Sequence, residues 1–267
     1  MGNPVRYAII SDIHANLEGL RAVVDSLAAE RIDRVVCLGD VVGYHSEPSA
    51  CLAMTRALDP IWIAGNHDRA VTGQIDLARF SHLAVKAIAW TRERLSAAEI
   101  GLLSALPLRA EIDGVMLAVH GAWHVEEGCE WARLSTDEER RKTLQAVAAH
   151  PSGARICAVG HSHFLRVHRL DGMEVHRILG DELELDGKGC YLINPGTIGD
   201  PRSSEHRATY LIYDSDTAHL QIRRITYDFL TTLRKTAAAG LRPLSPVNRL
   251  PRPIRSVIKR FTRGPMD

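Results

Sequence analysis

Aspartate, histidine and asparagine side chains follow five short apolar segments of this sequence. They are Asp12 and His14 after 7–10, Asp40 after 35–38, Asn66, His67 and Asp68 after 61–64, His120 after 115–119, and His161 and His163 after 156–160. Short apolar runs predict buried strands. In α/β proteins, functional sites form outside the carboxyl ends of strands. We therefore expect the five endings to converge on one site.

The side chains at these endings are the oxygen and nitrogen ligands that divalent cations bind. We expect seven ligands, and Asp40 can bridge two ions because a carboxylate has two oxygens. The predicted ligands are Asp12, His14, Asp40, Asn66, His120, His161 and His163. Two such ions, of Mn, Fe, Zn or Mg, would share a hydroxide nucleophile and hold both oxygens of a displacement. His67 stays free to protonate the leaving group, and Asp68 is expected to orient its ring.

Strands and helices alternate in the first half of the sequence, which is typical of parallel pairing in an α/β fold. The pattern predicts strands near 5–11, 34–39, 61–64, 108–112, 115–119, 155–160, 167–170, 174–178, 190–193, 208–213 and 219–226. Helices are expected from Asn16 to about 30, over 47–58, within 76–106 and from Ser135 to about 150. Ser96 with Glu99, and Ser135 with Glu138, are predicted capping boxes. Asp113-Gly114 and Asp171-Gly172 predict hairpins.

These elements predict two sheets packed face to face with helices outside them. We expect residues 1–230 to form one domain and residues 231–267 a basic appendage. That appendage contains nine Lys or Arg residues and one acid, and four prolines interrupt its first part. Three interpretations of it stay open: a solvated end, an amphipathic helix over 251–263, or a segment that attracts nucleic acid or anionic membrane.

Composition narrows the class and the compartment. The chain has 267 residues, 45% of them hydrophobic, and a net charge of +1. Five scattered cysteines without a CxxC motif argue against a disulfide framework and favour the cytoplasm. The sequence shows no signal peptide and no apolar run long enough to cross a membrane, so we expect a cytoplasmic protein.

In their order and spacing, these motifs resemble the calcineurin-like metallophosphoesterase superfamily. The motifs are Asp12-x-His14, Gly39-Asp40, Gly65-Asn66-His67-Asp68, His120-Gly121 and Gly160-His161-x-His163. The resemblance spans roughly residues 5–200 and implies a four-layer αββα sandwich with two mixed β-sheets and a dinuclear centre. It also implies that Asp12, His14, Asp40 and His163 bind the first metal. Asp40, Asn66, His120 and His161 would bind the second, with His67 as proton donor and Asp68 behind it.

Two further segments are similar to the small bacterial and archaeal phosphodiesterase branch of that superfamily. They are 39–44, with Glu47-Pro48 and Cys51 after it, and 194–202, followed by 207–210. His45 stands where that branch usually has glycine, and it is a candidate to reach the cleft. Tyr44, Asn194 and Arg202 are predicted to bind substrate, by stacking or by contacts with phosphate oxygens. Alternatively, Tyr44 is a packing residue, Asn194 belongs to a tight turn, and Arg202 is a solvated charge.

The leading hypothesis is a metal-dependent phosphoesterase, either a phosphodiesterase or a phosphatase, that acts on small phosphate esters or nucleotides. The second hypothesis is a nuclease or nucleic-acid processing enzyme in which the basic end guides the substrate; strong salt dependence would distinguish it. The third is a non-catalytic metal-binding scaffold, against which the complete set of motif residues argues. Substrate, metal identity and oligomeric state are left open.

Overall fold

A computed structural model describes residues 4–202 and 206–241 of the chain. The strands in these ranges are β1 (Arg6–Ile10), β2 (Arg34–Cys37), β3 (Ile61–Trp62), β4 (Arg109–Ile112), β5 (Met116–Val119), β6 (Ile156–Ala158), β7 (Leu165–Asp171), β8 (Glu174–Ile178), β9 (Glu182–Glu184), β10 (Cys190–Pro195), β11 (Arg207–Asp214) and β12 (His219–Thr226). The helices are α1 (Leu17–Ala28), α2 (Pro48–Ala57), α3 (Asn66–Thr72), α4 (His82–Arg92), α5 (Ala97–Ser104), α6 (Asp137–Ala148) and α7 (Phe229–Ala238).

The strands form two mixed six-stranded sheets. The first has the order β3-β2-β1-β11-β12-β9 and the second the order β4-β5-β6-β10-β7-β8. β1, β2 and β3 pair in parallel, as do β5, β6 and β10, while the other pairings are antiparallel. Parallel strands end on the same side, so the loops after β1, β2, β5 and β6 can meet there.

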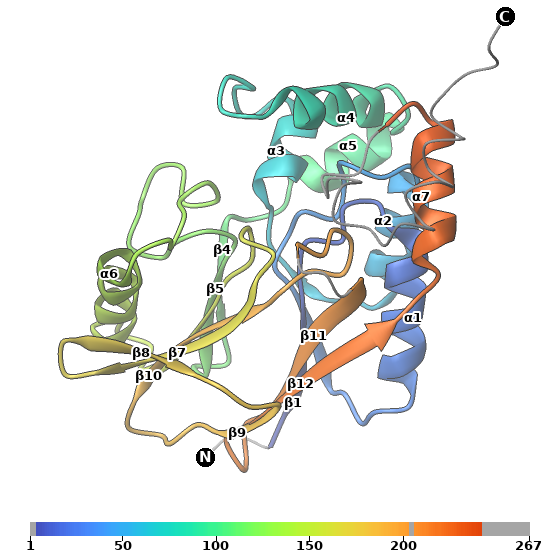
Figure 1. Cartoon of the computed structure of the whole chain (residues 1–267). Helices are drawn as coiled ribbons and strands as arrows, with labels where there is room; N and C mark the ends of the chain where they lie inside the picture. Colours follow the sequence, from blue (N-terminus) through green and yellow to red (C-terminus); the bar gives the residue numbers. More distant parts are fainter. Residues whose placement is uncertain (1–3, 203–205, 242–267) are drawn as a thin grey trace, which may run out of the picture.

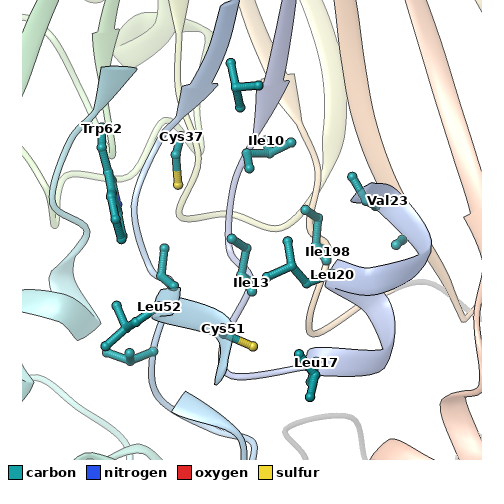
Figure 2. Close-up of a cluster of buried hydrophobic side chains, with 14 of the residues drawn as sticks. Ile10, Ile13, Leu17, Leu20, Val23, Cys37, Cys51, Leu52, Trp62 and Ile198 are labelled. Carbon is teal, nitrogen blue, oxygen red and sulfur yellow. The ribbon is translucent and has the colours of Figure 1, made fainter. Parts of the chain in front are cut away.

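Three apolar cores separate four layers, which confirms the predicted αββα sandwich (Figure 1). The core between the sheets includes Ile9 and Leu211 of the first sheet and Ile193 of the second. The outer face of the first sheet packs on α1 and α2, where Figure 2 shows Leu20 beside Ile13. The outer face of the second sheet packs on α6. Successive side chains along a strand point to opposite faces of the sheet, so each strand contributes side chains to the cores on both faces.

Helix starts follow side-chain capping, with one shift from the prediction. Asn16 accepts from the backbone N–H of Gly19 and caps α1 as expected. Ser96 and Glu99 form the predicted capping box of α5. At α6 the predicted box of Ser135 with Glu138 is wrong, because the box lies one residue later, at Thr136 and Glu139. Ser135 with Glu138 and Thr136 with Glu139 have the same S/T-x-x-E spacing.

The segment 76–81 is not helical, although the sequence predicted helix from residue 76. The carboxylate of Asp76 accepts from the N–H of Ala78, and this local bond competes with a helical turn. The hydroxyl of Ser81 then accepts from the N–H of Ala84, so α4 begins only at His82. The loop places Phe80 against the functional site described below.

α7 crosses the predicted boundary at residues 230 and 231. It lies alongside α1 (Figure 1), and its Thr232 hydroxyl donates to Oδ1 of Asn16 at 2.9 Å. Leu233 and Leu241 are buried. Structure that belongs to the main domain therefore continues to residue 241. The predicted role of 231–267 as an appendage, with its basic charge and the helix over 251–263, lies mostly outside the described residues.

All five cysteines are buried and free of disulfides. No helix within 4–202 or 206–241 has the length and apolar character needed to cross a membrane.

Candidate metal centre

Five of the seven predicted ligands converge at the carboxyl ends of β1, β2, β5 and β6. All five are buried. Their nitrogen and oxygen atoms form three groups in which every ligand atom lies within 4.8 Å of the others. The groups are Asp12 with His14 and His163, Asp12 with Asp40 and His120, and His14 with Asp40 and His67. The last group brings in His67, which the sequence analysis kept apart from the ligands.

Two carboxylate oxygens lie at the middle of this cluster. Oδ2 of Asp40 is 3.2 Å from Nε2 of His120 and 3.7 Å from Nε2 of His14. Oδ1 of Asp12 is 3.3 Å from Nε2 of His163 and 3.7 Å from Nε2 of His14. Asp12, His14 and Asp40 each belong to two of the three groups, so these three side chains lie at the centre of the cluster.

Several of these buried atoms have no hydrogen-bond partner. They include Oδ1 of Asp12, Nε2 of His120 and Nε2 of His161. A buried polar atom without a partner costs about 1–3 kcal/mol, so such a cluster points to a ligand that satisfies it. Carboxylate and imidazole donors suit Mg²⁺, Mn²⁺, Fe and Zn²⁺. The residues therefore fit a divalent metal centre.

The outward ring nitrogen of three histidines is held by a backbone carbonyl. The contacts are His14 Nδ1 with Val42 O at 3.2 Å, His120 Nδ1 with Leu38 O at 2.7 Å, and His163 Nδ1 with Asp200 O at 2.9 Å. A protonated Nδ1 donates to each carbonyl, which leaves Nε2 facing the cluster. This arrangement orients an imidazole and fixes the tautomer that binds a metal.

Asn66 and His161, the other two predicted ligands, pair with each other. Oδ1 of Asn66 lies 2.8 Å from Nδ1 of His161, and both residues line the cleft above the cluster. The ring of His161 lies 5.5 Å from that of His120, measured between centroids. The structure thus places them at the side of the cluster nearest to His120.

Electrostatics in the cluster keep the carboxyl groups ionised. Burial alone raises the pKa of Asp12 and of Asp40, but the imidazoles outweigh burial and hold both pKa values below the usual range. Burial lowers the pKa of His120, but Asp40 and Asp12 outweigh it and raise the pKa to about 10. Burial lowers the pKa of His161 and His163 to about 3, so these rings are neutral near pH 7. Neutral imidazole is the form that binds metals.

The backbone of the site is strained. Residues with side chains rarely adopt positive φ angles, and each such residue costs about 1–3 kcal/mol. The predicted ligands in this conformation are Asp12 (53°), His14 (50°), Asp40 (54°), His161 (61°) and His163 (61°). Such strain gathers at functional sites because the surrounding fold enforces it.

Close packing of two loops explains a pair of glycines. A Cβ atom on Gly39 would lie 2.2 Å from the backbone nitrogen of Gly65, and one on Gly65 would lie 2.1 Å from Oδ1 of Asp40. Only glycine lets the loops after β2 and β3 approach this closely. The approach also lets the N–H of His67 donate to Oδ1 of Asp40 at 2.7 Å.

Comparison with known proteins decides the family. The profile of the calcineurin-like phosphoesterase superfamily domain matches residues 5–218. The chain belongs to this superfamily. An uncharacterized protein of Methanocaldococcus jannaschii, MJ0912, is 34% identical over 233 residues, which cover 85% of this chain and 90% of that protein. Similarity to a protein without an assigned activity supports the family and leaves the substrate open.

Two solved structures resemble this calcineurin-like phosphoesterase along almost its whole length. A metallophosphoesterase from Sphaerobacter thermophilus is 32% identical with a TM-score of 0.72, and the match covers 96% of this chain and 99% of that one. The hypothetical protein PH1004 from Pyrococcus horikoshii is 16% identical with a TM-score of 0.69, covering 95% and 97%; this likeness shows the fold alone. The protein is thus a hydrolase of phosphoric esters, as the sequence predicted.

His67, the predicted proton donor, lies on the floor of the cleft beside the metal cluster. Its ring packs 4.8 Å from that of His14 and 4.3 Å from that of Tyr44. Nδ1 is buried without a hydrogen-bond partner and lies against Gly43. Burial lowers the pKa of His67, whereas the carboxylate of Asp40 raises it and favours the protonated ring that a proton donor requires.

Asp68 does not orient His67, and the expected contact between them is not formed. Its Oδ2 accepts from the N–H groups of Asp40 and Gly65, and its Oδ1 from those of Val41 and Val42. The side chain points back toward the start of α3, as at the third position of a capping box. The carboxylate therefore joins the two loops that carry Asp40 and Asn66.

The three predicted substrate residues lie in different environments. Tyr44 is buried under the cleft and contacts the rings of His14 and His67. The amide of Asn194 donates to the carbonyl of Gly160 and accepts from the N–H of Gly196, so it supports the loop that carries His161. Arg202 lies at the edge of the cleft, where its guanidinium can reach a bound anion. Their roles in substrate binding stay predictions.

His45 does not line the cleft. Its Nδ1 is 2.8 Å from the hydroxyl of Thr236 and its Nε2 is 3.1 Å from the carbonyl of Gly199. Nδ1 therefore connects the loop after β2 with α7, and Nε2 connects it with the loop after β10. Burial lowers the pKa of His45 to about 3, so the ring is neutral in this role.

The cleft over the cluster has a volume of about 440 Å³. The residues in its walls that sequence reasoning missed include Arg79, Phe80 and Arg133. Phe80 packs edge-to-face on Trp131, with ring centroids 4.4 Å apart. These residues belong to loops outside every motif, so only the fold brings them to the site. The cleft thus combines aromatic and cationic side chains above a metal cluster.

Proposed function

We propose that this phosphoesterase hydrolyses small phosphate esters, nucleotides among them, at a centre of two divalent cations. The observation that carries the proposal is the position of Asp40, whose Oδ2 lies within 3.7 Å of Nε2 of both His120 and His14. Asp12, His14 and His163 form a neighbouring group of ligand atoms. Asn66 and His161 pair with each other beside His120. Two bound cations would act as Lewis acids and lower the pKa of the attacking water.

The chain's own residues supply orientation and a proton. Nδ1 of His67 lies against Gly43, which leaves Nε2 as the nitrogen able to reach a leaving-group oxygen in the cleft. The N–H of its backbone is held by Asp40, so the ring keeps a fixed place beside the cluster. Positioned proton donors of this kind contribute about 10²–10⁴-fold to rate.

The cleft walls favour organic phosphates of modest size. Phe80 and Trp131 offer ring surfaces on which a planar group such as a nucleobase can stack. Arg79, Arg133 and Arg202 line the same space, and guanidinium groups pair with phosphate oxygens through two parallel hydrogen bonds.

The test compares leaving groups in the full chain with Mn²⁺ present. Rates on bis-p-nitrophenyl phosphate and p-nitrophenyl phosphate establish the preference for diester or monoester. We then expect His67→Ala to slow phenyl phosphate by at least about 100-fold and p-nitrophenyl phosphate far less, since p-nitrophenolate leaves with little protonation.

His82→Ala is the matched control, because His82 is exposed at the start of α4 and lies outside the cleft. It should keep wild-type rates on both esters. Equal losses on both esters in His67→Ala would remove His67 as proton donor. Absence of turnover on every ester, with metal bound, would refute the proposed function.

A further inference from the structure

A second cavity adjoins the catalytic cleft. Its volume is about 240 Å³, equal to roughly eight water molecules at liquid density. Arg133, His161, Phe164 and Arg202 line both spaces, so the two adjoin beside the metal cluster. The cavity extends from there between the start of α6 and the outer face of the second sheet.

The walls of this cavity are strongly basic. Its lining includes Arg133, Arg140, Arg166 and Arg202, together with His161 and His168. Among the residues described, no aspartate or glutamate lines it. Asp137 pairs with one of these groups, Arg140, from outside the lining. Burial lowers the pKa of Arg166, and the neighbouring Arg177 and Arg140 lower it further, because the cationic groups repel one another.

Hydrogen bonds hold the side chain of Arg140 in a fixed position in the basic wall. Arg140 is 8% exposed. One guanidinium nitrogen donates to Asp137, and another donates to the carbonyl of Ser135 at 2.9 Å. These bonds fix the planar group at the edge of the cavity. A fixed guanidinium loses little conformational entropy when it binds an anion.

His168 is a second, independent indication that the cavity binds a ligand. The residue is 6% exposed, lines the cavity, and its Nδ1 has no hydrogen-bond partner. On β7 it shares a face with Arg166, because the two lie two positions apart on a strand, with Val167 between them. Their partners on β10, Leu192 and Asn194, also line the cavity.

We propose that this cavity binds a second phosphate group of the substrate, one that is not cleaved. The inference rests on the proposed function and narrows it to esters that carry two or more phosphate groups. A phosphate here would pair with Arg140 and Arg166 and accept from a ring nitrogen of His168. The shared wall at Arg133 and Arg202 lets one chain of phosphates reach from the cavity to the metal cluster.

The first test measures binding without catalysis. Tripolyphosphate is titrated into the full chain after treatment with a chelator, so that the anion cannot bind through a metal. Tryptophan fluorescence reports binding, because Trp131 lines the adjoining cleft. We expect Arg166→Gln to weaken binding about tenfold or more, the typical effect of losing a charged hydrogen bond. Arg166→Lys keeps the positive charge but loses the planar guanidinium group, so its affinity for tripolyphosphate should lie between those of the wild type and Arg166→Gln.

Arg141→Gln is the matched control. Arg141 follows Arg140 on α6, pairs with Glu138 and does not line the cavity. It removes the same charge from the same region, so we expect less than a twofold change. Equal affinities in Arg166→Gln and Arg141→Gln would overturn the site. His168→Gln provides a second variant, expected to weaken binding as Arg166→Gln does, and thermal melting verifies that each variant is folded.

The second test connects the cavity with substrate. With excess Mn²⁺, Arg166→Gln should raise KM for a nucleoside 5′-triphosphate several-fold more than KM for p-nitrophenyl phosphate. An equal change in both KM values would overturn the role in substrate binding. Failure here is distinct from failure of the proposed function, which would appear as absent hydrolysis of every ester while tripolyphosphate binding still depends on Arg166.

Discussion

The carboxylate of Asp68 illustrates how single buried side chains hold this site together. It accepts four backbone N–H groups, two of which belong to Asp40 and Gly65. Burial is the main cause that raises its pKa, to about 7, and the N–H groups of Gly65 and Val42 oppose this. Its function is therefore to fix the distance between the loops after β2 and β3.

We predict that Asp68→Asn destabilises the fold by about 2–4 kcal/mol, because the amide NH₂ would face two buried N–H donors and leave them without an acceptor. Urea unfolding measures the change. Asp76→Asn is the control: Asp76 accepts one N–H in an exposed loop, so its substitution should stay within about 0.5 kcal/mol. Similar values for the two variants would contradict the role assigned to Asp68.

Residue types and their spacing were sufficient to predict that these carboxylates and imidazoles come together, but not how the residues around them support the cluster. Asp12 and His14 follow a strand, and the end of a strand is visible in the sequence. The partners of Asp68 lie up to 28 positions away in the chain, and only the folded loops bring them together. The same holds for Arg166 and His168, whose cavity needs α6 packed beside β7.

At the scale of elements, α7 couples the end of the described chain to the site. Thr236 contacts His45, and Leu241 packs with Tyr44 beneath the cleft. The prolines after residue 242 and the basic charge suggested an appendage from 231 onward. The helix ends before these prolines, and its buried face of Thr232, Leu233 and Thr236 is too short a pattern to stand out in the sequence.

Leu233→Ala should therefore destabilise the domain by about 2–4 kcal/mol, since Leu233 is 4% exposed and its truncation leaves a buried cavity. Urea unfolding is again the measurement. Arg234→Ala, on the exposed side of the same helix, serves as control and should change stability by no more than about 0.5 kcal/mol. A loss below 1 kcal/mol in Leu233→Ala would indicate that α7 is only loosely attached.

Across the whole molecule, the sandwich brings the parallel strands of both sheets to one end, where buried carboxylates and imidazoles meet. Alternating apolar residues and turn signals were enough to predict the hairpins and every described strand except β9, because these patterns are local. The loop at 76–81 escaped prediction, since one side-chain bond and one cap outweighed helical propensity there. Loops of this kind carry the cleft walls, so the sequence alone did not show which side chains line the cleft.

Metal binding should stabilise the whole domain, because the cluster forms only in the folded chain. At a free Mn²⁺ concentration of 100 times Kd, one site contributes about 2.7 kcal/mol, and this raises Tm by roughly 5–10 °C in a domain of this size. Melting of chelated and Mn²⁺-loaded protein measures the shift. Asp40→Asn should lose most of this Tm shift, since Asp40 lies beside both His14 and His120. Asp76→Asn should retain the shift. A full shift in Asp40→Asn would place the stabilising metal elsewhere and contradict the shared ligand.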